Sequence, residues 1–158
     1  MGQSLPGLRW EGADVDAGIL AEARQRPLLR HDPLHHLSAG HPLPFADNAF
    51  DAVTFCSVLF LLPDPAPLLA EAWRVLRPNG RILALTPSGA VRVTPALMGQ
   101  MGWPPHNWTF FLWRQMTKGN GRVWAKGVQL ATFARQNGAT FTRQPVFHKL
   151  AIVEKAQP

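Results

Sequence analysis

The sequence predicts an α/β fold in which a mostly parallel sheet ends in a C-terminal antiparallel hairpin. Apolar segments typical of strands alternate with segments of helical periodicity along the chain. Phe50–Leu59 is almost wholly apolar, which is typical of a central parallel strand covered on both faces. Thr140–Val146 and Lys149–Glu154 follow the last helical segment and are expected to close the sheet as an antiparallel pair.

Size and composition indicate one domain over residues 1–158. The chain has 158 residues, of which 46% are apolar and 16% charged, and this is enough to bury a core. The single cysteine, Cys56, excludes an internal disulfide framework and is expected to be a small buried apolar residue. The longest apolar stretch, Ala52–Leu62, is too short to span a bilayer, and the N-terminus does not resemble a secretory signal. We therefore expect a cytoplasmic protein without a membrane partner.

Charge is distributed unevenly along the chain. The formal net charge is +6, and residues 72–153 hold eleven arginines and lysines but no acid. Such a region attracts a phosphorylated or carboxylated substrate, a nucleic acid or an anionic membrane surface. No dense basic run with interleaved aromatic residues is present, so solvated side chains are the preferred interpretation over nucleic-acid binding.

The N-terminal third is expected to contain one strand and one helix. Leu8–Asp14 reads as a short strand that ends in acids, and Asp16 can cap a helix over Ala17–Arg26. Residues 27–48 are predicted to be a loop because four prolines and an Asp-Asn turn signal interrupt them.

The following elements are predicted from capping and periodicity. Asp64 can cap a helix with Pro65 at its first position, and an apolar stripe runs along that helix. The turn 78–80 ends the helix, and Arg81–Leu85 is the next strand. Residues 87–126 look least regular, and the glycines in 119–121 should break any helix there. Val128–Gln136 is predicted to be a helix that Gly138 stops.

Three motifs lie at a diagnostic spacing. They are the acid-ended strand Gly12–Asp16, the segment Leu43–Asp51 with the pattern LPF-x-D-x-x-FD, and the helix end and turn Glu71–Arg81, which reads EAWRVLRPNGR. Together they resemble the class I S-adenosylmethionine-dependent methyltransferases, most closely the type 11 group of small-molecule methyltransferases. The resemblance covers roughly residues 8–86. It implies a Rossmann-like methyltransferase sheet, S-adenosylmethionine as cofactor and methyl transfer to a small-molecule acceptor.

The resemblance also implies roles for individual residues. Asp14 corresponds to the acid that binds the cofactor's ribose hydroxyls. Asp16 neighbours that position, although helix capping is its preferred role, and Leu43 is similar to the residue that packs near adenine. Glu71 and Arg74 are interpreted as structural. The segment expected to pass the methionine part of the cofactor holds Cys56, Ser57 and Phe60.

One departure concerns the glycine-rich cofactor loop, which in dinucleotide-type folds lies about 20 residues before the ribose acid. Only thirteen residues precede Asp14, and they contain no G-x-G. We therefore expect the loop and the first strand to fall before Met1, and the chain as written to bind S-adenosylmethionine weakly or not at all. Two alternatives stay open, a non-catalytic methyltransferase-like binding module and an RNA methyltransferase.

The remaining candidates lie in loops and in the aromatic segment. His31, His35, His36 and His41 do not have the spacing of a zinc site, so no metal is expected. His106 is a weak candidate for a general base. Residues 87–126 are expected to form a lid or substrate insertion, with Trp103, Trp108 and Trp113 as a wall over the acceptor. A helix that buries Trp108, Phe111 and Leu112 is an equally open alternative. The sequence does not indicate an oligomeric state.

Overall fold

The computed structural model describes residues 8–27, 29, 32–89 and 106–158. The chain forms two compact units, residues 1–44 and residues 45–158. The expectation of one domain over residues 1–158 stays a prediction.

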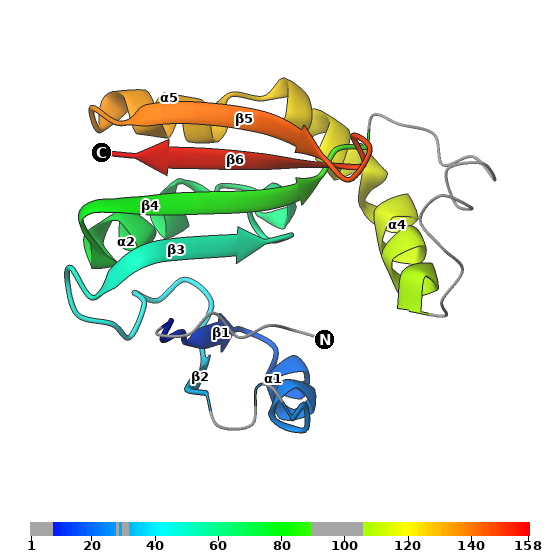
Figure 1. Ribbon diagram of the computed structural model, residues 1–158, viewed down its shortest axis with the longest axis horizontal. Helices are drawn as coiled ribbons and strands as arrows, with labels where there is room; N and C mark the ends of the chain where they lie inside the picture. Colours follow the sequence, from blue (N-terminus) through cyan, green and yellow to red (C-terminus); the bar gives the residue numbers. More distant parts are fainter. Residues whose placement is uncertain (1–7, 28, 30–31, 90–105) are drawn as a thin grey trace. The chain divides into compact units, whose positions relative to one another are not determined.

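The first unit contains a two-stranded parallel sheet and one helix (Figure 1). Strand β1 (Gly12–Asp14) pairs with β2 (Leu34–His36), and helix α1 (Ala17–Arg24) connects them. Strand β2 lies inside the segment predicted to be a loop, so that prediction was wrong there. Pro33 donates no backbone hydrogen bond but accepts one through its carbonyl, from the Gly12 N–H at 2.9 Å, which starts the pairing.

The second unit is a four-stranded sheet in the order β3-β4-β6-β5. Strand β3 (Phe50–Cys56) pairs in parallel with β4 (Leu76–Pro87), and β6 (Ala151–Gln157) pairs antiparallel with both β4 and β5 (Thr140–Val146). The sequence predicted a mostly parallel sheet with a C-terminal antiparallel hairpin. In the described residues the sheet is mixed, with β3 and β4 parallel, and the predicted closing antiparallel pair is confirmed. Strand β3 pairs only with β4 among the described strands, and several of its side chains are exposed, so the expectation of cover on both faces was wrong.

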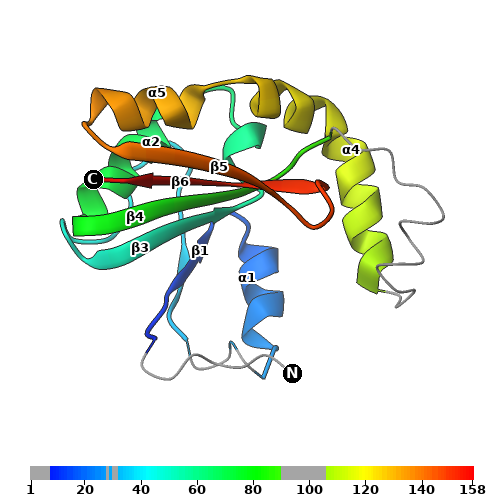
Figure 2. The same cartoon turned by 45° about the horizontal axis from the view of Figure 1, so that its top comes forward.

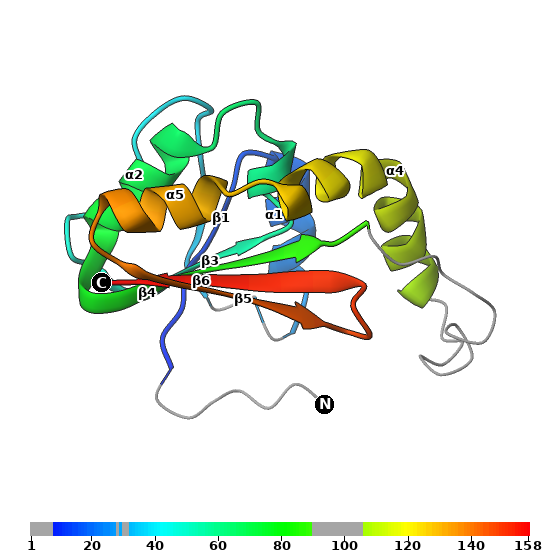
Figure 3. The same cartoon turned by 90° about the horizontal axis from the view of Figure 1, so that it is seen from above.

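Helices cover one face of this sheet (Figure 3). Helix α2 (Ala66–Val75) and helix α5 (Gln129–Gln136) lie side by side on it, and the short helix η1 (Leu59–Leu61) follows β3. Alternate residues of β4 and β6 are buried under the helices, as period-two strands require. The core between the two layers includes Leu69, Ile82, Trp124, Leu130 and Ile152.

Helix α4 (His106–Lys126) is the main departure from the sequence prediction. Residues 87–126 were expected to be irregular, yet Pro87 ends β4 and residues 106–126 form one helix that continues through Gly119 and Gly121. Close packing explains why residue 121 is glycine, since a Cβ there would lie 2.3 Å from the Pro87 carbonyl oxygen. The helix therefore crosses the end of β4 at backbone contact distance, which only glycine permits.

Candidate functional site

The carboxyl end of β1 carries the residue that the resemblance assigns to ribose binding. Asp14 is the last residue of β1, and its Oδ1 accepts a hydrogen bond from the Asp16 N–H at 2.9 Å. Asp16 caps α1, because its Oδ1 accepts from the N–H groups of Gly18 at 2.7 Å and Ile19 at 3.1 Å. The structure therefore confirms the helix-capping role that the sequence favoured for Asp16.

The carboxyl end of β3 carries the next predicted group. Cys56 is the last residue of the strand and is exposed, so the expectation of a buried cysteine was wrong. Ser57 has a φ of 59° and donates its N–H to the Leu85 carbonyl at 2.8 Å, which turns the chain sharply off the sheet. Phe60 lies in η1 with its side chain buried in the core. Ligands in α/β sheets bind beyond the carboxyl ends of strands, and Cys56 and Ser57 are at such an end.

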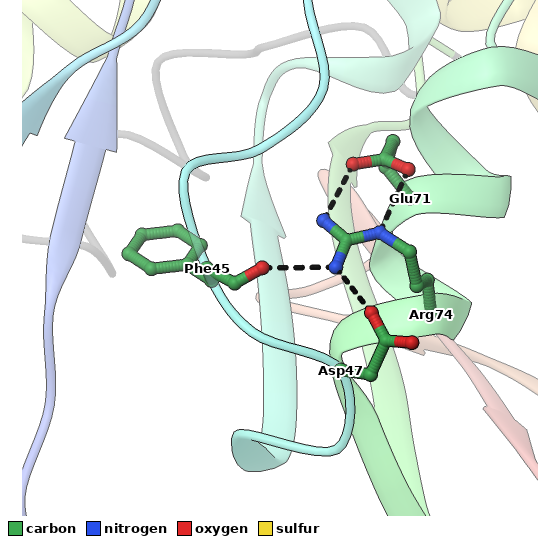
Figure 4. Close-up of polar contacts among 4 residues, drawn as sticks. All are labelled: Phe45, Asp47, Glu71 and Arg74. Atoms are coloured by element: carbon green, nitrogen blue, oxygen red, sulfur yellow. Dashed lines mark hydrogen bonds and ion pairs between the residues drawn. The ribbon is translucent and has the colours of Figure 1, made fainter.

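The segment after Leu43 is held by an arginine clamp, which Figure 4 shows in close-up. The Arg74 guanidinium donates to both carboxylate oxygens of Glu71, at 2.9 and 2.8 Å, to Asp47 at 2.6 Å and to the Phe45 carbonyl at 2.9 Å. The hydrogen bonds that Arg74 donates to the Glu71 and Asp47 carboxylates raise the pKa of Arg74 above its ordinary value. Leu43 itself is half-buried. The interpretation of Glu71 and Arg74 as structural residues agrees with this geometry.

A second set of contacts fastens the same segment further along. The N–H groups of Asn48 and Ala49 donate to the carbonyls of Arg74 at 3.1 Å and Val75 at 2.8 Å. Arg77 donates to the Asn48 carbonyl at 3.2 Å and to Asp51 at 2.7 Å. The segment Leu43–Asp51 and the helix end and turn Glu71–Arg81 are therefore joined by these contacts, which we call the interlock. The two motifs lie about thirty residues apart because they meet at the amino end of β3 and β4.

A buried network that the sequence analysis missed joins α4 to the hairpin. Glu154, fully buried on β6, accepts from Trp124 Nε1 and, at 2.6 and 3.0 Å, from two nitrogens of Arg143 on β5. Arg143 also donates to the carbonyls of Ala125 and Gly127, each at 2.9 Å. Glu154 is the only acid after Glu71, and that isolation in a basic region was the available signal.

The expected acceptor lid is described only in part. Trp103 lies outside the described residues, and His106 and the positions of Trp108, Phe111 and Trp113 are in α4, with side chains outside the description. Leu112 is 62% exposed, which contradicts the alternative in which it is buried. Trp124, from the same predicted segment, is buried in the core. The lid and the role of His106 therefore stay predictions.

In the described ranges, no three or more His, Cys, Asp or Glu side chains gather into a metal-holding group. His35 instead pairs with Glu11 at 2.7 Å, and His36 contacts the Val15 carbonyl at 3.1 Å. Of the helices described, none combines the length and apolar character needed to cross a bilayer.

The helix-covered mixed sheet of the second unit is an α/β arrangement, and solved methyltransferase structures share this Rossmann-like fold. Among solved structures, a SAM-dependent methyltransferase from Aquifex aeolicus matches with a TM-score of 0.58 at 16% identity, covering 94% of this chain and 68% of that one. A family model described as "Methyltransferase domain" matches residues 4–84. The chain belongs to this methyltransferase family, which confirms the resemblance to the type 11 group and its association with S-adenosylmethionine.

Curated relatives match over the same part of the chain. The ubiquinone/menaquinone biosynthesis C-methyltransferase UbiE of Desulfotalea psychrophila is 38% identical over 85 residues, which are 54% of this chain and 34% of the relative. The malonyl-[acyl-carrier protein] O-methyltransferase of Alcanivorax borkumensis is 34% identical over 85 residues, 54% of this chain and 29% of the relative. The chain thus spans about a third of the length of these curated relatives.

Proposed function

We propose that this protein binds S-adenosylmethionine and transfers its methyl group to a small-molecule acceptor. The observation that carries the proposal is the position of the predicted cofactor residues. Asp14 is the last residue of β1, Cys56 is the last residue of β3, and Ser57 follows it, so each stands at the carboxyl end of a parallel strand. The family match supports the same assignment.

The donor and acceptor chemistry of these residues fits the cofactor. The Asp14 carboxylate can accept hydrogen bonds from both ribose hydroxyls. Ser57 adopts a left-handed conformation, which turns the chain directly after the end of β3. When bound, the cofactor supplies a methyl group already activated on a sulfonium. The protein then contributes mainly proximity and alignment, and a general base is not a requirement.

The interlock around Arg74 supports the proposal indirectly. It fixes the backbone of residues 45–49 on the end of α2, and Leu43, assigned to adenine packing, lies two residues before that fixed segment. We propose that the interlock holds the segment in place before the cofactor binds, so that less ordering is needed on binding.

Ligand-observed NMR tests the assignment of Asp14, because saturation transfer detects weak as well as tight binding. We expect saturation transfer to the adenosine protons of S-adenosylhomocysteine and a clear reduction with Asp14→Ala. Losing hydrogen bonds to a charged group corresponds to about 1.5–3 kcal/mol. The matched control is Glu22→Ala, which removes an exposed carboxylate on α1 and should leave the signal unchanged. Equal signals from the Asp14→Ala and Glu22→Ala variants would show that a residue other than Asp14 binds the ribose.

Methyl transfer itself is tested with a radiolabelled methyl donor. Labelled product from a mixture of small quinols, phenols and carboxylates would support the enzyme, because the two curated relatives are named as a C- and an O-methyltransferase. Cofactor binding without any transfer across the mixture would favour the non-catalytic binding module.

A further inference from the structure

Helix α4 exposes a row of large apolar side chains. Leu112 is 62% exposed, Met116 82% and Val123 67%. Their spacing of four and then seven residues places them on one face of the helix, with Gly119 between them. The buried positions Thr117 and Trp124 lie on the other side of the helix. Among the described residues of this unit, the row is therefore not the packed face of α4.

The tip of the β5–β6 hairpin exposes a further large apolar side chain. Phe147 is 61% exposed. Phe147, His148 and Lys149 have φ values of 49°, 53° and 66°, three consecutive left-handed residues without glycine. This conformation is costly for residues with a Cβ, so the surroundings must hold it. Ser88 does so, since its Oγ donates to the Lys149 carbonyl at 2.6 Å and its N–H to the Leu150 carbonyl at 2.9 Å.

The helix row and the hairpin tip are at the same end of the sheet. Ser88, which holds the tip, is flanked by Pro87 and Gly89, and α4 crosses both of these residues. Arg122 of α4 donates from Nε to the Gly89 carbonyl at 2.9 Å. Figures 1, 2 and 3 agree, since in each view α4 and the hairpin tip lie at the carboxyl ends of β3 and β4. Both elements therefore border the end of β4.

Cations accompany these apolar side chains. Arg122, Lys126 and Lys149 are exposed, and the sequence has no acid from residue 72 to residue 153. We call Leu112, Met116, Val123 and Phe147, together with these three cations, the apolar-cationic surface. Exposed apolar side chains that gather on one surface mark an interaction site, and here the charged residues named with them are all of one sign.

We propose that the apolar-cationic surface docks on an anionic lipid bilayer. Acyl chains accept the apolar side chains, and lipid phosphates pair with the arginine and lysines, so one partner satisfies both features. A second copy would bring like charges together with no acid in this region to pair with them. RNA would pair with the cations but would leave the aliphatic side chains of α4 in water. This docking is peripheral and needs no membrane-spanning helix.

The docking has one consequence that rests on the proposed function. Ligands of α/β sheets bind at the carboxyl ends of the strands, and this is the end that would face the bilayer. A lipid-borne acceptor could then reach the site directly from the membrane. The sequence led us to expect no membrane partner, and the proposal replaces that expectation for this surface.

Vesicle sedimentation of the full chain tests the docking without cofactor or acceptor, so its failure is separate from any failure of the proposed function. The probes are vesicles of phosphatidylcholine with phosphatidylglycerol and vesicles of phosphatidylcholine alone. The apolar variant is Leu112→Gln/Met116→Gln/Val123→Gln. Its matched control is Val15→Gln/Ile19→Gln, two comparably exposed apolar side chains of the first unit. A charge variant is Lys126→Gln/Lys149→Gln, and circular dichroism verifies the fold of each.

We expect binding to the anionic vesicles only, weakened by salt. Binding by the apolar variant should fall by about tenfold or more, as removing three inserting side chains implies. The charge variant should lose about fivefold per lysine, while the control binds like the parent chain. No binding to anionic vesicles, or equal binding by the parent and the apolar variant, would overturn the proposal. The proposal would also be overturned if the parent chain formed a dimer that the apolar variant did not form, which would indicate a second copy as the occupant. RNA binding without vesicle binding would indicate RNA instead.

Discussion

The two ends of the four-stranded sheet are built in different ways. At the amino end, the segment 45–51 and the end of α2 are joined by charged and backbone hydrogen bonds centred on Arg74 and Arg77. At the carboxyl end, close backbone contacts at Gly89 and Gly121 bring α4 against β4. The amino end is closed by polar contacts, whereas the carboxyl end leaves Met116, Phe147 and Cys56 exposed.

Because of this difference, the residues that identify the family are not the residues proposed to take part in its chemistry. The most specific motif residues, Glu71, Arg74 and Asp47, are occupied with one another at the amino end. They identify the fold because they hold it together. The carboxyl end is the end at which we propose that the cofactor binds, and binding residues are commonly held by fewer mutual contacts than scaffold residues. Specific motifs in this chain thus locate the scaffold, whereas Cys56 and Ser57, which we propose to contact the cofactor, lie at the carboxyl end of β3.

The largest expected effect comes from the network that holds α4 over the sheet. Glu154→Ala removes the acceptor of both Trp124 and Arg143 and leaves a charged guanidinium without its carboxylate. Breaking a buried pair in this way costs about 3–5 kcal/mol. Urea unfolding followed by tryptophan fluorescence measures the loss.

The control for this variant is an exposed pair at the amino end. Asp51→Ala breaks the ion pair with Arg77, in which the Asp51 side chain is 83% exposed, and should cost no more than about 1 kcal/mol. Similar losses from Glu154→Ala and Asp51→Ala would show that the buried network stabilises the unit no more than an exposed ion pair at the amino end does.

A smaller loss is expected at the crossing of α4 over β4. In Gly121→Ala the new Cβ would lie 2.3 Å from the Pro87 carbonyl oxygen, which is backbone and cannot rotate away. Overpacking of this kind costs about 1–3 kcal/mol. The free energy of unfolding should fall accordingly, and Arg122, which bonds the neighbouring Gly89 carbonyl, should lose that contact. Unchanged stability would mean that α4 can lift from β4 without cost.

A local effect is expected at the amino end. Arg74→Gln removes the fork that joins Glu71, Asp47 and the Phe45 carbonyl. The amides of Asn48 and Ala49, which bond the last carbonyls of α2, should then exchange faster with solvent. Amides in the β4–β6 ladder should keep their protection. Faster exchange throughout the sheet would show that the clamp supports the whole unit and not only this end.

Much of the second unit could be predicted because its signals are local. The predicted bounds of β5 match the structure, and α5 begins one residue after its predicted start. The acid at the end of β1 was located correctly because a strand followed by a capped helix leaves few other positions for it. Each of these signals depends on residues that are near one another in the sequence.

The missed features depend on contacts between distant segments. Strand β2 has three residues, which is too short for a periodic signal, and pairing with β1 stabilises it. Continuation of a helix through residues 119–121 was not expected because of Gly119 and Gly121, each of which costs about 1 kcal/mol in a helix. Burial of Trp124 and the contact of Gly121 with Pro87 offset that cost, and both arise only in the folded unit.

The smallest expected effect separates the two kinds of glycine in α4. Gly119 has nothing within 4 Å of the position where a Cβ would stand, whereas Gly121 is in close contact with the backbone of β4. Gly119→Ala should therefore raise the free energy of unfolding by about 0.5–1 kcal/mol, the helix-propensity difference. Urea unfolding beside Gly121→Ala gives the comparison within one helix. Gly119 also lies in the exposed row with Met116 and Val123, so the same variant distinguishes what covers the row. A fluid lipid surface accommodates one methyl group, and vesicle binding should be kept. A helix of a second copy, packed closely at the glycine, would be displaced by that methyl group, and loss of an association with Gly119→Ala would argue for that partner instead.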